Sequence, residues 1–298
     1  MPKKPAGHWQ KHIQKTVYTL NVSPDGKGTY NPEICELTYP LIQAYADKIG
    51  ARFEVITERK FPDFPAVYEK LQIFEKGKGG YAVDNDGEHV IVPPNDWNIF
   101  IDSDALVSPE FFDITQHLSK DTVCHNGKDM ATVRWKYDQY FMRDGRHFGS
   151  CNWFTVGSDW CLDLWHPLED LTLEQALKNI YITIAEHNSG QFNDNHLIDD
   201  YTLSRNIARY GLKTTTVTDI CERIGWRGQD GKGFNPFLYH LYAISREEKV
   251  QRLLAVLSAP QNTIIKNPAN PDATPWGLGW GLMDQDTAMA FREKWGLN

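Results

Sequence analysis

The sequence predicts an α/β protein: a single domain with a mostly parallel central sheet flanked by helices. Strand-like and helix-like segments alternate along the first hundred residues, which is the order found in parallel sheets with crossover helices. The short apolar run Trp97–Ile101 is typical of a strand buried on both faces. Neither an internal repeat nor a linker interrupts the 298 residues, which favours one elaborated domain over two.

The clearest elements lie in the first hundred residues. Residues 15–22 are rich in β-branched and aromatic side chains and run into the turn signal Ser-Pro-Asp-Gly, which predicts a strand. Apolar residues at helical spacing over 31–49, closed by Gly50, predict a helix, and 52–57 again predict a strand. Further along we expect a helix over 64–76, a hairpin at 88–92 within a Gly-rich acidic loop, and the strand at 97–101.

The rest of the chain continues the alternation with longer loops. Ser108-Pro109-Glu110 has the residue types of a helix start, with Ser as N-cap and Pro in the first turn. Strands are predicted at 151–156, 212–217 and 237–244, and helices at 159–165, 171–185, 200–210 and 246–258. A Trp-rich tail follows the last helix.

Composition and charge narrow the class of protein. With 31 Lys and Arg against 39 Asp and Glu, the net charge is −8, so the chain lacks the broad basic field of a nucleic-acid binder and DNA is an unlikely partner. The basic N-terminal segment has no apolar stretch after its lysines, so it does not resemble a signal peptide, and no window is apolar for long enough to span a membrane. Five cysteines at irregular spacing predict reduced, structural thiols.

Asp102 and Asp104, separated by one residue just past the buried strand, are the sharpest chemical feature. Ligands of open α/β sheets bind at the carboxyl ends of the strands. Two carboxylates there need a counter-charge, and hard oxygen ligands select Mg²⁺ or Mn²⁺, which in turn favours a phosphate-bearing ligand. The alternative is a pair of solvated loop acids or helix caps. The preceding strand favours the metal site.

Several segments resemble one family. Residues 68–74 (YEKLQIF) and 96–107 (DWNIFIDSDALV) resemble the segment of nucleotide-sugar-dependent glycosyltransferases of the GT-A fold that leads into their D-x-D motif. Residues 149–154 and 158–165 are similar to a stretch of α-galactosyl and α-xylosyl transferases. The resemblance implies a GT-A-like, Rossmann-like catalytic domain over 15–258, preceded by a flexible arm, 1–14, and followed by an aromatic extension, 259–298, packed on it.

The resemblance also implies roles for five residues. Asp102 would contact the ribose and metal side of the donor, Asp104 would bind the metal that bridges its diphosphate, and His240 would be the third protein ligand. Asp199 and Asp200 would be the acid pair that opens a helix, with Asp200 binding the acceptor hydroxyl or taking its proton. Alternatively, the acid pair only stabilises a helix N-terminus, and His240 is a core histidine.

A further set of residues would surround the donor. The family holds the base and ribose at the end of the first strand, and the diphosphate near a lysine and a mobile loop. The corresponding residues here are Tyr18, Thr19, Asn21, Lys70, Ser103 and Lys232. Alternatively, the first three are ordinary strand residues and Lys70 is an exposed helix lysine. Aromatic residues that are able to stack on a sugar ring lie near the end of the chain: Trp226, Tyr242, Trp276 and Trp280.

The predicted activity is therefore a metal-dependent hexosyl or pentosyl transfer. The donor would be a nucleoside-diphosphate sugar, UDP-sugar first among them, with Mn²⁺ or Mg²⁺ as cofactor. The acceptor would be a glycan, lipid, protein, small molecule or modified nucleobase, and both retention and inversion stay open. Because no anchor is expected, unlike in Golgi members of these families, a cytoplasmic bacterial or phage enzyme is predicted.

Two alternatives compete with this function. A haloacid-dehalogenase-like phosphatase would use Asp102 as nucleophile, Asp104 as acid/base and Asp199-Asp200 for Mg²⁺. A non-catalytic sugar-nucleotide-binding module would keep the fold without turnover.

Overall fold

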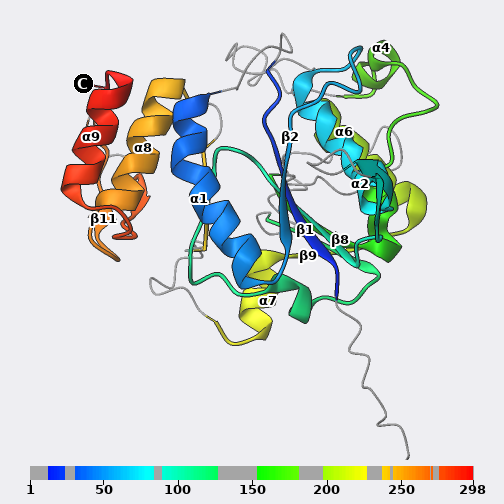
Figure 1. The fold of residues 1–298 in the computed structure, drawn as a ribbon, viewed down its shortest axis with the longest axis horizontal. Coiled ribbons are helices and arrows are strands. Elements are labelled where there is room, and N and C mark those ends of the chain that lie inside the picture. The colour runs from blue at the N-terminus through cyan, green and yellow to red at the C-terminus, as the bar shows by residue number, and fades with distance from the viewer. Residues whose placement is uncertain are drawn as a thin grey trace, which may run out of the picture.

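The computed structural model describes residues 13–23, 31–83, 89–126, 153–180, 197–226, 237–241, 244–268, 270 and 275–297. At its centre lies a six-stranded sheet in the order β2-β1-β5-β8-β7-β9 (Figure 1). The strands are β1 (Lys15–Leu20), β2 (Arg52–Ile56), β5 (Trp97–Ile101), β7 (Thr122–His125), β8 (Phe154–Ser158) and β9 (Lys213–Thr216). Only β8 runs against the other five strands of this sheet. The predicted fold class, α/β with a mostly parallel sheet flanked by helices, is confirmed.

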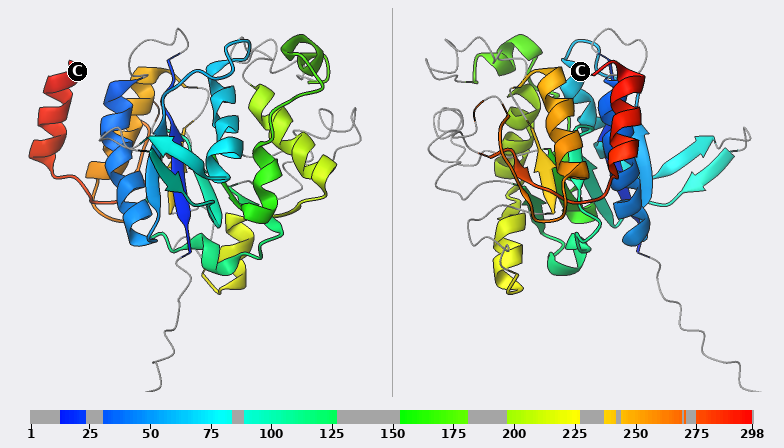
Figure 2. Two further views of the ribbon diagram at one scale, coloured as in Figure 1. Left: turned by 45° about the vertical axis from the view of Figure 1, so that its right-hand side comes forward. Right: turned by 90° about the vertical axis from the view of Figure 1, so that its left-hand side faces the viewer.

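Helices cover both faces of the sheet (Figures 1 and 2). On one face, α1 (Pro32–Lys48) and α7 (Val217–Arg223) pack on a core that includes Ile99 and Ile101. The other face packs against the 3-10 helices η1 (Ala66–Gln72) and η3 (Asp159–Trp165) and the helices α2 (Ile73–Gly77), α4 (Leu173–Leu177) and α6 (Ile198–Tyr210). Because both faces are covered, all five residues of β5 are buried.

A third apolar cluster joins the C-terminal helices to the sheet domain. Helix α1 turns a second side, with Ile34 and Leu37, toward α8 (Arg246–Ser258) and α9 (Gln285–Trp295). Ser245 caps α8 because its hydroxyl accepts a hydrogen bond from the Glu248 amide at 3.1 Å. Helix α8 has the bounds that the sequence predicts, whereas α9 and α7 were not predicted. No helix among those described is long and apolar enough to cross a membrane.

Among the described residues, three strand pairs lie outside the main sheet. The short strand β6 (Ala105–Val107) pairs antiparallel with β10 (Leu238–His240). The hairpin of β3 (Gly80–Val83) and β4 (His89–Val92) extends away from the sheet, as Figure 2 shows. The hairpin predicted at 88–92 corresponds over its described residues, 89–92, to the second strand of this pair. Near the C-terminus β11 (Ile264–Ile265) pairs with β12 (Gly277–Leu278).

The predicted helix start at Ser108 is wrong. Ser108 begins a single turn, closed by the Phe111 amide donating to the Ser108 carbonyl at 2.9 Å. Phe111 is fully buried and stacks on Tyr45 with ring centroids 5.3 Å apart, so the chain bends into the core instead of continuing as a helix. The next helical turn, η2 (Ile114–His117), starts after Asp113, whose carboxylate accepts from the Thr115 amide.

Other predicted helices form, but as 3-10 helices or as shorter segments. The helix expected over 64–76 is divided into η1 and α2, and that over 159–165 is the 3-10 helix η3. Helix α4 occupies only part of the range 171–185, whose last residues lie outside those described. A capping box of Thr172 with Gln175 sets its start.

Candidate metal and donor site

The D-x-D residues lie in the turn that leaves β5 at the carboxyl edge of the sheet. The Asp102 amide donates to the Trp153 carbonyl at 2.7 Å, and the Ala105 amide donates to the Asp102 carbonyl at 3.1 Å. Ser103 is half-buried, and its carbonyl accepts from the Thr38 hydroxyl at 2.5 Å. The turn is thereby anchored to β8 on one side and α1 on the other, which holds both carboxylates at the same edge.

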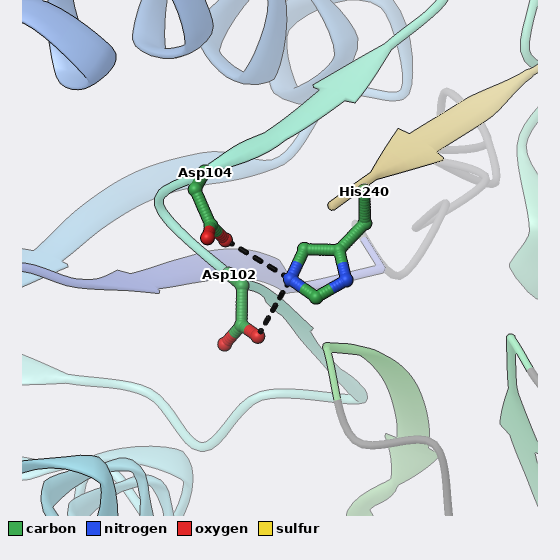
Figure 3. A group of neighbouring side chains, drawn as sticks. All are labelled: Asp102, Asp104 and His240. Carbon is green, nitrogen blue, oxygen red and sulfur yellow. Dashed lines mark ion pairs between the residues drawn. The ribbon is translucent and has the colours of Figure 1, made fainter. Parts of the chain in front are cut away.

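Strand pairing brings His240 to these carboxylates from a distant part of the chain. In the β6–β10 ladder His240 lies opposite Ala105, the residue after Asp104. Its Nε2 lies 3.1 Å from Asp104 Oδ1 and 3.6 Å from Asp102 Oδ2 (Figure 3). One ligand atom from each of the three residues lies within 4.8 Å of the others. Two carboxylate oxygens and an imidazole nitrogen at this spacing fit a divalent cation.

Trp153 fixes the orientation of the His240 ring. The two rings stack with centroids 4.9 Å apart and planes 15° from parallel. Trp153 immediately precedes β8, so the same short segment bonds the Asp102 backbone and packs on the histidine. The sequence prediction assigned no role to Trp153, although it lies in a segment that resembles the transferases.

Lys249 is a second contributor that the sequence prediction missed. It projects from the first turns of α8, and its ammonium pairs with Asp104 Oδ2. Burial by itself would raise the pKa of Asp104, but His240 and Lys249 outweigh this effect and hold the pKa below its ordinary value. Asp104 is therefore an ionised carboxylate near neutral pH.

Lys70 is buried beside the D-x-D turn, so its interpretation as an exposed helix lysine is wrong. Its Nζ lies 2.6 Å from Asp199 Oδ2 and 3.6 Å from Asp102 Oδ1, and 4.6 Å from the centre of the Phe100 ring. Burial would lower the pKa of Lys70, but the two carboxylates outweigh it, and the pKa lies above its ordinary value. For Asp102, burial dominates over Lys70 and His240 and raises the pKa.

The predicted acid pair occupies the first turn of α6. Asp199 is buried and uses both carboxylate oxygens: Oδ2 contacts Lys70, and Oδ1 accepts from the Asp200 amide at 2.9 Å. Asp200 is half-buried in the same turn. Asp199 therefore has a charged partner, Lys70, in addition to the amide in the first turn of α6. This contact links α6 to the D-x-D turn.

The residues predicted at the end of β1 are placed less favourably for contact with a nucleotide. Tyr18 has no exposed surface; its hydroxyl accepts from Asn95 Nδ2 at 2.9 Å, and burial raises its pKa well above the ordinary value. Thr19 is also fully buried. Asn21 is buried at the carboxyl end of the strand, and its backbone amide donates to the Ile56 carbonyl at 2.8 Å. The Tyr18 side chain thus lies in the core, where it contacts Asn95.

The remaining predicted residues divide into two groups. Lys232 and Tyr242 lie outside the described residues. Trp226 packs on Phe237, with ring centroids 4.3 Å apart, and the Trp276 ring lies 5.0 Å from the Arg252 guanidinium. Trp280 packs in the cluster formed by α1, α8 and α9.

Similarity of this chain to known proteins is found among solved structures. No family model matches the chain, and no curated protein matches it. Among solved structures, the chain is similar to a glycosyltransferase involved in the glycosylation of the major capsid of PBCV-1, with a TM-score of 0.40 and 10% identity over 80% of this chain and 98% of that one. It is also similar to the galactosyltransferase LgtC, solved with donor and acceptor sugar analogs, with a TM-score of 0.39 and 11% identity over 80% of this chain and 94% of that one.

Proposed function

We propose that this chain is a metal-dependent glycosyltransferase that moves a sugar from a nucleoside-diphosphate sugar to an acceptor hydroxyl. The observation that carries the proposal is the convergence of Asp102, Asp104 and His240 at the carboxyl edge of the sheet, from segments that lie more than a hundred residues apart. The resemblance of residues 96–107 to the D-x-D segment of GT-A enzymes supports the same conclusion.

The three residues would hold Mn²⁺ or Mg²⁺. Carboxylate oxygens suit both ions, and the imidazole nitrogen favours Mn²⁺. A divalent ion bound there supplies a Lewis acid that neutralises the charge developing on the departing nucleoside diphosphate. The pKa of Asp104 lies below its ordinary value, which suits this carboxylate to the role because a metal ligand must be deprotonated.

The other residues of the site position one another and the substrates. Lys70 binds Asp199 and lies near Asp102, so one buried ammonium sets the distance between the D-x-D turn and α6. Asp199 is committed to this contact, and Asp200, half-buried in the same turn, is the proposed group that binds the acceptor hydroxyl or receives its proton. Asn21 and Ser103 are the proposed contacts to the nucleotide, and a UDP-sugar is the proposed donor.

The phosphatase alternative requires chemistry that the site disfavours. It needs Asp104 as a general acid, which must carry a proton near neutral pH. The contacts of Asp104 with His240 and Lys249 hold its pKa below the ordinary value of a carboxyl group, so it is poorly suited to donate a proton. This observation favours glycosyl transfer over the phosphatase.

A calorimetric screen of nucleotide sugars, with and without Mn²⁺, tests the proposal. We expect tight binding of one diphosphonucleotide sugar that requires the ion, and release of the nucleoside diphosphate when an acceptor is supplied. Loss of a residue that only orients a metal ligand lowers metal affinity roughly 10–100-fold. Asp104→Asn changes a proposed ligand itself and should weaken Mn²⁺ binding by more than this. Asp170→Asn is the matched control, since Asp170 is an exposed carboxylate paired with Arg205 away from the site.

Four outcomes would count against the proposal. Phosphate release from simple phosphomonoesters would support the phosphatase, and ion-dependent donor binding without turnover would support the binding module. Failure of every nucleotide sugar to bind would remove the proposed donor. An unchanged Mn²⁺ affinity in Asp104→Asn would remove the metal site on which the assignment rests.

A further inference from the structure

We infer that Lys249 is a built-in counter-cation of Asp104 that positions this carboxylate and weakens the binding of divalent cations at the site. The inference rests on the proposed metal site and adds a residue to it. It starts from the division of Asp104 between two partners: Oδ1 lies 3.1 Å from His240 Nε2, and Oδ2 pairs with the Lys249 ammonium. Both side chains of the ion pair are largely buried, at 16% and 21% exposed.

A rigid element delivers the ammonium. Helix α8 is capped by Ser245 and packs its buried face, which includes Val250 and Leu253, against α1. Arg246 in its first turn pairs with Glu33 of α1, so α8 is tied to the helix that also bonds the D-x-D turn through Thr38. Lys249 is therefore held at Asp104 by packing and by a neighbouring ion pair.

The charged groups around Asp104 affect how tightly a divalent cation would bind there. Three carboxylates, those of Asp102, Asp104 and Asp199, contact two ammonium groups, those of Lys70 and Lys249. Lys70 pairs most closely with Asp199 and also contacts Asp102, whereas Lys249 is the ammonium that pairs with Asp104. A dication bound by Asp104 has this ammonium as a near neighbour, and their repulsion opposes binding.

The size of the effect follows from Coulomb's law. A unit charge and a dication about 5 Å apart repel enough, even at the dielectric constant of water, to weaken binding by roughly tenfold. Lys249→Met, which keeps the length of the side chain and removes the charge, should therefore bind Mn²⁺ about tenfold more tightly. Lys249→Arg keeps the charge and should bind Mn²⁺ as the wild-type protein does.

The test is Mn²⁺ titration by electron paramagnetic resonance, with no sugar nucleotide present, on the wild-type protein, Lys249→Met, Lys249→Gln and Lys249→Arg. Lys294→Met is the matched control: it makes the same substitution at an exposed ion pair with Glu36 on α9. We expect the two neutral variants to bind more tightly and the arginine variant and control to match the wild-type protein. Equal or weaker binding by both neutral variants would overturn the inference.

Thermal unfolding provides a second readout. In metal-free buffer the neutral variants should unfold at a lower temperature than the wild-type protein, because Asp104 loses its partner. Added Mn²⁺ should raise their unfolding temperature by more than it raises that of the wild-type protein. If wild-type protein binds no Mn²⁺, the proposed function falls and this inference with it; if it binds and the neutral variants bind no better, this inference alone fails.

Discussion

Replacing Lys70 with Met should destabilise the protein because it leaves two carboxylates without their shared cation. The Lys70 and Asp199 side chains are 3% and 6% exposed, and their charged atoms lie 2.6 Å apart. Removing one member of a buried ion pair costs about 3–5 kcal/mol, since the remaining charge stays buried without compensation. For a chain of 298 residues this lowers the unfolding temperature by about 5–8 °C.

Urea unfolding followed by tryptophan fluorescence, in the presence of a chelator, measures this loss without any contribution from bound metal. The matched control is Lys78→Met, because Lys78 also pairs with a carboxylate, Glu75, and also lies over an aromatic ring, that of Phe74, but at the surface. Its loss should be below about 1 kcal/mol.

A double-mutant cycle separates the ion pair from other effects of the substitution. Adding Asp199→Asn to Lys70→Met should recover a large part of the lost stability, because the uncompensated charge is removed with its partner. A loss below about 1 kcal/mol for Lys70→Met, or the same loss for Lys78→Met, would refute the argument that the buried pair holds α6 to the D-x-D turn.

Three further predictions concern the surroundings of the site. Trp153→Leu removes the ring stacked on His240 and should weaken Mn²⁺ binding roughly 10–100-fold in a calorimetric titration. Trp153→Phe keeps a ring there and should bind Mn²⁺ with an affinity close to that of the wild-type protein. Equal Mn²⁺ affinities of Trp153→Leu and the wild-type protein would exclude the orienting role. Burial lowers the pKa of His125 from 6.5 to about 4, so the folded state binds fewer protons between these values. Its contribution to the free energy of unfolding should rise by roughly 3 kcal/mol from pH 4 to pH 6.5, and a pH series of urea unfolding curves should be less steep for His125→Gln than for wild type; an unchanged slope would contradict this. Gly79 has a φ of +69°, and an added Cβ would lie 2.4 Å from the Val92 carbonyl oxygen, so Gly79→Ala should cost about 1–3 kcal/mol in the same assay, and no loss would show that the hairpin shifts freely.

Local features of the sequence determined much of the fold. Residues 97–101 are apolar at every position, as a strand covered on both faces requires, and the two aspartates that follow were placed at the sheet edge for that reason. The helix predicted over 246–258 is observed at these bounds as α8, and Ser245 caps its start. Such signals depend only on neighbouring side chains, so they are readable without the tertiary structure.

Only the tertiary structure decided which side chains meet around Asp102 and Asp104. His240 reaches them through the register of β6 with β10, and Lys249 through the packing of α8 on α1. The burial of Lys70 beside Asp199 likewise requires η1 and α6 to pack on the same sheet face. These contacts join residues that are far apart in the chain, and their energies depend on register, burial and charge compensation in the folded state, which short-range periodicity does not contain.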